Sequence, residues 1–345
     1  MSLWSRLKET FARWFRREPA PGSYLDGRAA AWNGWLAMNP TVLPRRDYRL
    51  YVPRGASRFR RMPLIVLLHG CKQTPDEIAR GARIAALADR LGSYVLLPQQ
   101  SEGANPYRCW NWFDTATASG RGEAAIVASM MRKALRWRRR DDARTAAVGM
   151  SAGGALAAIL GVHHGDAVRA VVTVAGIASG AVTSPLTALT VMKRGPETDV
   201  AAIGRVAHAS ASADASRVPL LAIHGRHDDV VAARHAAALA RQYLARNGFA
   251  VPEGADSSLP DPDHARHEVP VRGHGFQVRD WEAEGRLVVH DAAMRRQGTA
   301  AFIMRITGLL PAGHDRMLRD AITLHQFHVD ELLDPFRSQH AVVQP

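Results

Sequence analysis

The feature that most constrains the fold is an alternation of short apolar runs with longer amphipathic runs from about residue 48 onward. A continuous apolar run of roughly four to eight residues is typical of a strand buried on both faces, and the amphipathic runs have the period of helices. The alternation therefore predicts an α/β fold, with a mostly parallel central sheet covered by helices on both faces. The expected strands are residues 48–53, 63–70, 93–100, 145–150, 168–176 and 218–225, and the expected helices are 77–92, 122–138, 152–164 and 232–248.

The length and the charge of the chain bear on its domains and partners. With 345 residues, 47% of them hydrophobic, we expect one α/β domain over residues 46–340, preceded by an N-terminal amphipathic helical extension over residues 1–45. The formal net charge of +13 favours acidic partners, but the basic residues are spread along the chain and no recognition motif accompanies them. We therefore expect no nucleic acid among the partners. The oligomeric state does not follow from the sequence.

The first 17 residues, "MSLWSRLKETFARWFRR", have the pattern of a basic amphipathic helix. Charged residues interrupt the apolar ones, so the stretch does not match a secretory signal, and no run in the chain is long enough for a transmembrane helix. Such a helix can lie on a membrane surface, or it can pack on its own domain or on a partner subunit. With either role for the helix, the protein could be cytoplasmic or could be exported by a route that the sequence does not identify. Its apolar stripe consists of Leu3, Trp4, Leu7, Phe11, Trp14 and Phe15.

A serine stands where the expected strand 145–150 meets the expected helix 152–164, in the string Gly149-Met150-Ser151-Ala152-Gly153. The pattern Gly-x-Ser-x-Gly is typical of a nucleophile elbow, a sharp turn that exposes a serine hydroxyl at the carboxyl edge of a sheet. The small residues on either side let the strand and the helix pack closely. The pattern predicts Ser151 as a catalytic nucleophile.

A serine nucleophile needs a base to take its proton and an acid to orient that base, in the chain order Ser, Asp or Glu, His. Asp228 and Asp229 follow the expected strand 218–225. We favour Asp228 as the acid and expect Asp229 to cap the next helix. His274 and His314 both come later in the chain. We prefer His314 as the base, because it follows a stronger apolar run at residues 301–309, and His274 is the alternative.

The oxyanion of an acyl-transfer reaction needs backbone donors, usually the N–H after the nucleophile and a second one from the loop after an earlier strand. These positions are Ala152 and Cys71, and Gly70 allows a close turn before Cys71. The strands 63–70 and 93–100 are expected neighbours, which would bring Cys71 and Cys109 to the same rim of the sheet. These are the two cysteines of the chain, and we weigh a disulfide between them equally against two free thiols. No cysteine and histidine cluster has zinc spacing, so we expect no metal.

Several strings of this sequence resemble the polyhydroxybutyrate depolymerase family of esterases, α/β-hydrolases with feruloyl and acetyl xylan esterase relatives. The resemblance extends over roughly residues 46 to 235. It implies a serine esterase with Ser151 as nucleophile, Asp228 as acid, and Cys71 and Ala152 at the oxyanion hole. It also suggests that Trp110 and Trp112 line the substrate-binding surface, with core packing as the alternative. The strings are "LLHGCKQTPDE" (67–77), "CWNWF" (109–113), "VGMSAGGALAAIL" (148–160), "VAGIASG" (174–180) and "HGRHDDVV" (224–231).

The sequence departs from this family near its end. Members typically carry Gly-His-Ala-Trp-Ser-Gly-Gly around the catalytic histidine, whereas residues 308–317 read "GLLPAGHDRM". The preceding stretch, 275–289, still resembles the late hairpin of the family and supports His314. We expect a serine carboxylic ester hydrolase that works through an acyl-enzyme without a cofactor, on hydroxyalkanoate oligomers or on small or aromatic esters. The alternative is a catalytically weakened α/β-hydrolase that acts as a membrane-peripheral or scaffold protein.

Overall fold

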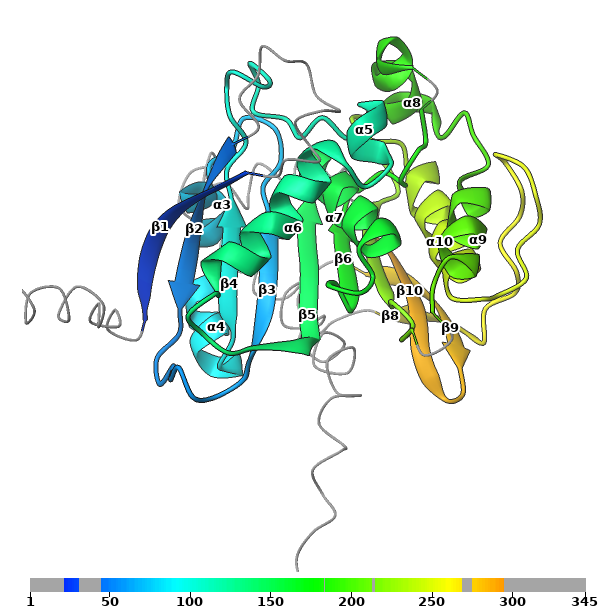
Figure 1. Ribbon diagram of the computed structural model, residues 1–345. Coiled ribbons are helices and arrows are strands. Elements are labelled where there is room, and N and C mark those ends of the chain that lie inside the picture. The colour runs from blue at the N-terminus through cyan, green and yellow to red at the C-terminus, as the bar shows by residue number, and fades with distance from the viewer. Residues whose placement is uncertain (1–21, 31–44, 183, 213–214, 269–274, 295–345) are drawn as a thin grey trace, which may run out of the picture.

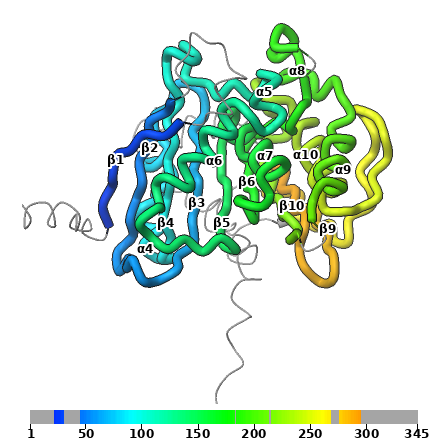
Figure 2. The backbone as a smooth tube through the Cα atoms, viewed as in Figure 1, coloured from blue at the N-terminus to red at the C-terminus, as the bar shows by residue number. Residues whose placement is uncertain are grey.

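A twisted β-sheet forms the centre of the molecule in the computed structural model, which describes residues 22–30, 45–182, 184–212, 215–268 and 275–294. Within these residues the strand order is β1-β2-β4-β3-β5-β6-β7-β10-β9-β8. Figure 2 shows β1 and β9 toward opposite ends of this sheet. The strands are β1 (Ser23–Ala30), β2 (Arg45–Val52), β3 (Met62–Leu68), β4 (Tyr94–Pro98), β5 (Arg140–Met150), β6 (Ala170–Val174), β7 (Leu220–Gly225), β8 (His264–Glu268), β9 (Phe276–Ala283) and β10 (Arg286–Met294).

The middle of the sheet is parallel and both margins are antiparallel. Neighbouring strands run parallel from β4 through β3, β5, β6 and β7 to β10, whereas β1, β2, β9 and β8 pair antiparallel with their neighbours. The pairing of β3 with β4, expected from the sequence, is confirmed, as is the late hairpin of β9 and β10. Because the parallel strands share one direction, their carboxyl ends form a single edge, which is where ligands of such sheets bind.

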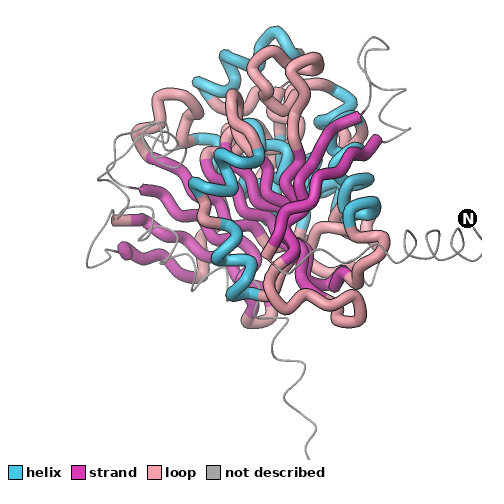
Figure 3. Tube along the Cα trace, turned by 90° about the vertical axis from the view of Figure 1, so that its left-hand side faces the viewer, coloured by secondary structure: helices cyan, strands magenta, loops and turns pink. Residues whose placement is uncertain are grey.

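Helices cover both faces of the sheet, as predicted (Figure 1). Helices α6, α7 and α10 contribute to the larger apolar core on one face, and α3 and α4 pack on the other face against β2, β3 and β4. Figure 3 shows helices on either side of the strands. The helical elements are α3 (Pro75–Gly81), α4 (Ile84–Leu91), α5 (Thr115–Ala118), α6 (Gly122–Ala134), α7 (Ala152–His163), the 3-10 turn η1 (Pro185–Thr187), α8 (Ala188–Arg194), α9 (Val200–Ala209) and α10 (Arg234–Arg246).

The helix expected over residues 77–92 is two helices. A capping box starts α3: the Thr74 side chain accepts from the Glu77 N–H at 3.3 Å, and the Glu77 carboxylate accepts from the Thr74 N–H at 2.7 Å. The chain then breaks at Arg83, which is left-handed with φ 47°, and α4 begins at the next residue. A residue in the left-handed conformation cannot continue an α-helix. The amphipathic stretch therefore forms two separate helices.

The sheet begins earlier than the domain boundary expected at residue 46. Strand β1 pairs with β2 along its whole length, and an ion pair joins Arg28 to Asp47 across the two strands. Residues 23–30 therefore belong to the α/β domain and not to a helical extension. The expected helix over residues 1–17 and the expected strand 301–309 lie outside the described residues. Among the helices that are described, none is long and apolar enough to cross a membrane.

Candidate functional site

Ser151 occupies a strained turn between β5 and α7. Its φ of 54° and ψ of −122° are rare for a residue with a side chain, and such strain persists only where the surroundings enforce it. The Ser151 N–H donates to the Val174 carbonyl of the neighbouring strand at 2.8 Å, and its own carbonyl accepts from Ala155 N–H at 2.9 Å. The backbone is thus fixed on both sides, which is the geometry expected of a nucleophile elbow.

Glycine is required on both sides of this turn. A Cβ atom added to Gly149 would overlap with the Gly153 backbone, and one added to Gly153 would overlap with the carbonyl oxygens of Leu68 and His69. Helix α7 therefore starts in direct contact with β5 and with the end of β3. The prediction that small residues flank Ser151 to permit close packing is confirmed.

The loop after β3 lies beside Ser151. A Cβ atom at Gly70 would stand 3.6 Å from the Ser151 Cβ and 3.4 Å from the Met150 carbonyl oxygen. The next N–H, that of Cys71, has no hydrogen-bond partner within the described part of the chain. The N–H of Ala152 opens α7, where the first N–H groups of a helix have no intrahelical acceptor. Among the described residues, two backbone N–H groups without an acceptor therefore lie beside the serine, at the two positions expected to supply the oxyanion donors.

A buried set of side chains holds the turn at Gly70. The Gly70 N–H donates to Gln73 Oε1 at 2.7 Å, and the Trp110 indole donates to the His69 carbonyl at 3.1 Å. His69 Nε2 accepts from the Gln100 N–H at 3.1 Å, so its proton resides on Nδ1, which donates to the Gly70 carbonyl at 2.8 Å. Burial lowers the pKa of His69 to about 4, so the imidazole is neutral at physiological pH. His69 is a structural support for the turn.

The two tryptophans of the string "CWNWF" are largely buried. Trp110 is 0% exposed and packs on the His69 ring with centroids 5.3 Å apart. It offers a substrate no surface, and the core-packing alternative describes it. Trp112 is 7% exposed and meets the Phe113 ring edge-on. Of the pair, only Trp112 retains any surface for a ligand.

Cys71 and Cys109 form a disulfide, with their Cα atoms 4.2 Å apart. Both cysteines of the chain are therefore paired, and the bridged alternative from the sequence is confirmed. The bridge joins the loop after β3 to the loop after β4. A second contact between the same loops is the Lys72 N–H, which donates to the Tyr107 carbonyl at 2.6 Å.

Asp228 lies past the end of β7 with its side chain 0% exposed. Its Oδ1 accepts from the N–H groups of Val230 and Val231, each at 2.9 Å. Its Oδ2 is buried and has no hydrogen-bond partner among the residues that the structure describes. A buried carboxylate oxygen without a hydrogen-bond donor destabilises the fold, because its desolvation is not compensated. A hydrogen bond from an N–H group removes this penalty. This is the state expected of an acid whose partner imidazole comes from elsewhere in the chain.

The neighbours of Asp228 do not compete for its role. Asp229 is exposed and does not cap α10, the next described helix. This helix starts after Ala233 without a side-chain cap, so the N-cap expectation for Asp229 was wrong. His224 Nε2 is 3.6 Å from Asp228 Oδ2, but the same nitrogen lies 2.8 Å from the Val231 carbonyl oxygen and must donate to it. Burial lowers the pKa of His224, which keeps this imidazole neutral.

The two candidate bases, His274 and His314, lie outside the described residues. Among the described residues, Phe276, the first residue of β9, is the register partner of Met294, the last residue of β10. Met294 in turn pairs with Gly225 of β7, three residues before Asp228. The first residue of β9 and the last residue of β10 therefore lie at the edge of the sheet that carries Asp228. Within the described residues, no group of three or more metal-ligating side chains is found.

Comparisons with known proteins identify the family of this chain. The family model described as esterase PHB depolymerase matches residues 46–267, which is more than half of the chain. The chain belongs to this esterase family. It is 31% identical over 184 residues to the poly(3-hydroxyalkanoate) depolymerase C of Paucimonas lemoignei, covering 53% of this chain and 44% of that protein. It is 28% identical over 144 residues to feruloyl esterase B of Thermothelomyces thermophilus, covering 41% of this chain and 47% of that enzyme.

The match spans less than half the length of these curated relatives. Among solved structures, the acetyl xylan esterase of Aspergillus awamori aligns with a TM-score of 0.61 at 16% identity, covering 83% of this chain and all of that one. This similarity supports the fold alone. The family match and the sheet together confirm the α/β-hydrolase fold and the family expected from the sequence strings.

Proposed function

We propose that this member of the family hydrolyses carboxylic esters through an acyl-enzyme on Ser151. The observation that carries the proposal is the strained Ser151 turn beside the Cys71 N–H, which has no acceptor among the described residues. Strain of this kind is retained where it serves a function, and the turn presents a hydroxyl between two backbone donors. Asp228, whose buried Oδ2 has no hydrogen-bond partner in the described part of the chain, supplies the acid.

In the proposed reaction, the imidazole of His314 takes the Ser151 proton as Oγ attacks the ester carbonyl carbon. The N–H groups of Cys71 and Ala152 stabilise the oxyanion, and Asp228 Oδ2 accepts from the protonated ring. The alkoxide leaves with the proton from the imidazolium. Water then attacks the acyl-enzyme through the same imidazole and releases the acid. His274 is the alternative base, and it stands only two residues before Phe276.

The substrate class follows from the relatives, whose names are those of a poly(3-hydroxyalkanoate) depolymerase and a feruloyl esterase. We therefore propose hydroxyalkanoate oligomers or small and aromatic esters as substrates, with Trp112 at the binding surface. Residues 1–17 are proposed to contact a membrane surface or a protein partner, as the basic amphipathic pattern of the sequence suggests.

The proposal is tested with Ser151→Ala and a short-chain nitrophenyl ester. Loss of the nucleophile should lower kcat by about three orders of magnitude or more, because only binding and the oxyanion donors remain. Ser129→Ala is the control, since its hydroxyl donates to the Ala30 carbonyl on another part of the molecule. A Ser151→Ala protein with half the activity of the wild type would exclude the mechanism. Absence of hydrolysis in the wild type would instead favour the weakened, non-catalytic alternative.

A further inference from the structure

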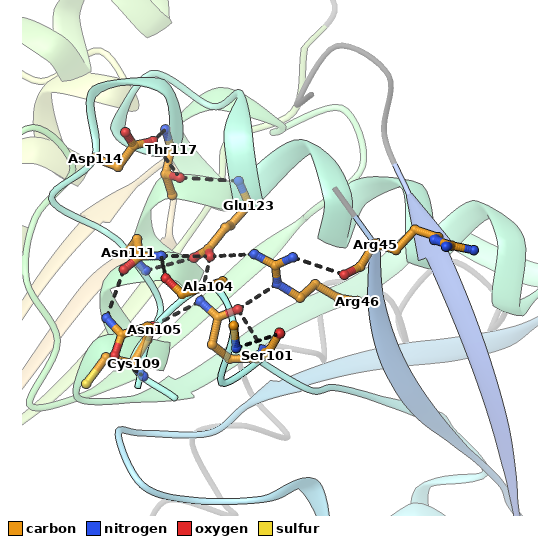
Figure 4. Close-up of polar contacts among 12 residues, drawn as sticks. Arg45, Arg46, Ser101, Ala104, Asn105, Cys109, Asn111, Asp114, Thr117 and Glu123 are labelled. Atoms are coloured by element: carbon orange, nitrogen blue, oxygen red, sulfur yellow. Dashed lines mark hydrogen bonds and ion pairs between the residues drawn. The ribbon is translucent and has the colours of Figure 1, made fainter. Parts of the chain in front are cut away.

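A buried ion pair lies behind the loop that carries Cys109. Arg46 of β2 and Glu123 of α6 meet at 3.1 Å, with both side chains about 1% exposed. Figure 4 shows Asn111 beside this pair. Gln100 contacts both members: its Oε1 accepts from Arg46 Nε, and its Nε2 donates to Glu123 Oε1. We call these four residues the Glu123 cluster. The sequence analysis did not identify any of them as a site residue, because no local sequence pattern shows that a polar or charged side chain is buried.

Glu123 binds the loop through both of its carboxylate oxygens. Oε2 accepts from the Asn111 backbone N–H at 2.7 Å. Oε1 accepts from Gln100 Nε2 at 2.5 Å, and from Arg46 Nη2 and Asn111 Nδ2 at 3.1 Å each. A carboxylate with this many donors is fully compensated for its burial. The negative charge thus holds two segments of the chain, the end of β4 and the residues after Cys109, in one arrangement.

Gln100 connects the cluster to both loops of the candidate site. Its Nε2 donates to the Cys109 carbonyl at 3.0 Å, and its Oε1 accepts from Arg46 Nε at 2.6 Å. Its backbone N–H donates to His69, the residue before the turn at Gly70. Gln100 is therefore the member of the cluster that contacts both loops, at Cys109 and at His69.

The loop between these anchors is also braced internally. Asn105 Oδ1 accepts from the N–H groups of Tyr107 at 2.9 Å and Cys109 at 3.4 Å, and Asn105 Nδ2 donates to Asn111 Oδ1 at 2.9 Å. The loop reaches the segment after β3 twice, through the disulfide and through the Tyr107 carbonyl. The loop that carries Cys109 is therefore joined to Cys71 by a covalent bond and to Lys72 by a hydrogen bond.

We propose that the Glu123 cluster is the positioning element for the Cys71 N–H, acting through Gln100, Cys109 and the disulfide. The inference rests on the proposed role of Cys71 as an oxyanion donor. A donor stabilises a transition state best when it is held in place before the reaction, and a misplacement of about 1 Å costs much of the rate. Stability alone does not require the cluster, because a buried ion pair is often no more stabilising than apolar residues of similar volume.

The first test separates positioning from substrate binding. Gln100→Ala and Glu123→Gln should each lower kcat for a nitrophenyl ester about tenfold while KM changes less than about twofold, because the donor acts on the transition state. Gln100→Ala leaves the Arg46–Glu123 pair in place and so is the variant more certain to fold. The matched control is Asn247→Ala, a buried amide that bonds Val218 and Tyr243 away from the loop. An equal fall in kcat in Asn247→Ala, or a rise in KM alone, would overturn the proposal.

The second test is a double-mutant cycle. The variant Cys71→Ala/Cys109→Ala keeps the backbone donor but removes the covalent link. If the cluster acts through that link, adding Gln100→Ala should lower kcat little further, whereas independent effects multiply. A full multiplication of the two losses would contradict the proposed route.

The third readout does not depend on catalysis. Gln100→Ala should speed amide hydrogen exchange both in peptides over residues 101–112 and in peptides over residues 70–74, and Asn247→Ala should do neither. Faster exchange in 101–112 alone would show that the cluster does not position Cys71. A wild-type protein without Ser151-dependent hydrolysis would refute the proposed function, while the exchange data would still decide whether the coupling exists.

Discussion

Backbone strain is concentrated at single residues around the candidate site. Among the described non-glycine residues with positive φ, Ser151 is joined by Lys72 at 63°, Arg108 at 52° and Ala175 at 50°. Lys72 and Arg108 each adjoin a cysteine of the disulfide, and Ala175 follows β6, whose Val174 binds the Ser151 N–H. Each such residue costs of the order of 1 to 3 kcal/mol, so the rim of the sheet is held by the packing beneath it.

The identity of the base is a second question at the scale of one residue. We expect His314→Ala to lower kcat as far as Ser151→Ala does. Without the base, the Ser151 hydroxyl keeps its proton and is a poor nucleophile. His274→Ala should keep most of the activity. The measurement is kcat for a nitrophenyl ester at pH 8, with circular dichroism to verify folding. The reversed pattern would assign the base to His274.

The disulfide is the element that joins the loops after β3 and β4. The variant Cys71→Ala/Cys109→Ala should lose about 3 to 4 kcal/mol of unfolding free energy, because it frees a closed loop of 38 residues in the unfolded chain. Urea unfolding measures this loss, and thiol titration of the denatured, unreduced wild type should find no free thiol. Two free thiols in that titration would contradict the bridge.

The elements that could be predicted from sequence are those with a local signal. Apolar runs marked β3 to β7, and two glycines marked the turn at Ser151, because each signal lies within a few residues. The break between α3 and α4 has no such signal, since Arg83 adopts its left-handed conformation without a glycine. Strand β1 was missed because its sequence, "SYLDGRAA", carries charged residues, and their ion-pair partners lie on β2, a separate segment of the chain.

The candidate site divides in the same way. Ser151, Cys71 and Ala152 follow from motifs at strand ends, and the choice of Asp228 over Asp229 gains support from burial. Gln100 and Glu123 could not be found, because the burial of a polar side chain depends on distant partners such as Arg46. The burial of Trp110 could not be predicted for the same reason. An aromatic side chain suits a core as well as a substrate cleft, and the distant residues around it decide which it is.

At the scale of the whole molecule, buried neutral histidines make stability depend on pH. Burial lowers the pKa of His69 and of His235 to about 4 from an ordinary 6.5. Above pH 6.5 both are neutral in the folded and unfolded states. Between pH 6.5 and 4 the unfolded chain binds protons that the folded protein does not, so stability falls as the pH is lowered.

We expect the unfolding free energy to be lower at pH 5 than at pH 7.5, by about 2 kcal/mol for each such histidine. Urea unfolding at the two pH values measures the difference. His235→Gln should reduce the difference, because a glutamine can still donate to the Val191 carbonyl that His235 contacts at 2.8 Å but does not titrate. An undiminished difference in that variant would show that His235 does not contribute to the pH dependence.

The central proposal is that Ser151 is an activated nucleophile. A fluorophosphonate probe tests it most directly, because only an activated hydroxyl reacts rapidly. The native protein is labelled, digested and mapped by mass spectrometry, with Ser151→Ala treated in parallel. The expected result is a single adduct on the peptide that contains Ser151, absent from the variant and from denatured protein. No adduct on the native protein, or the same adduct in Ser151→Ala, would contradict the account.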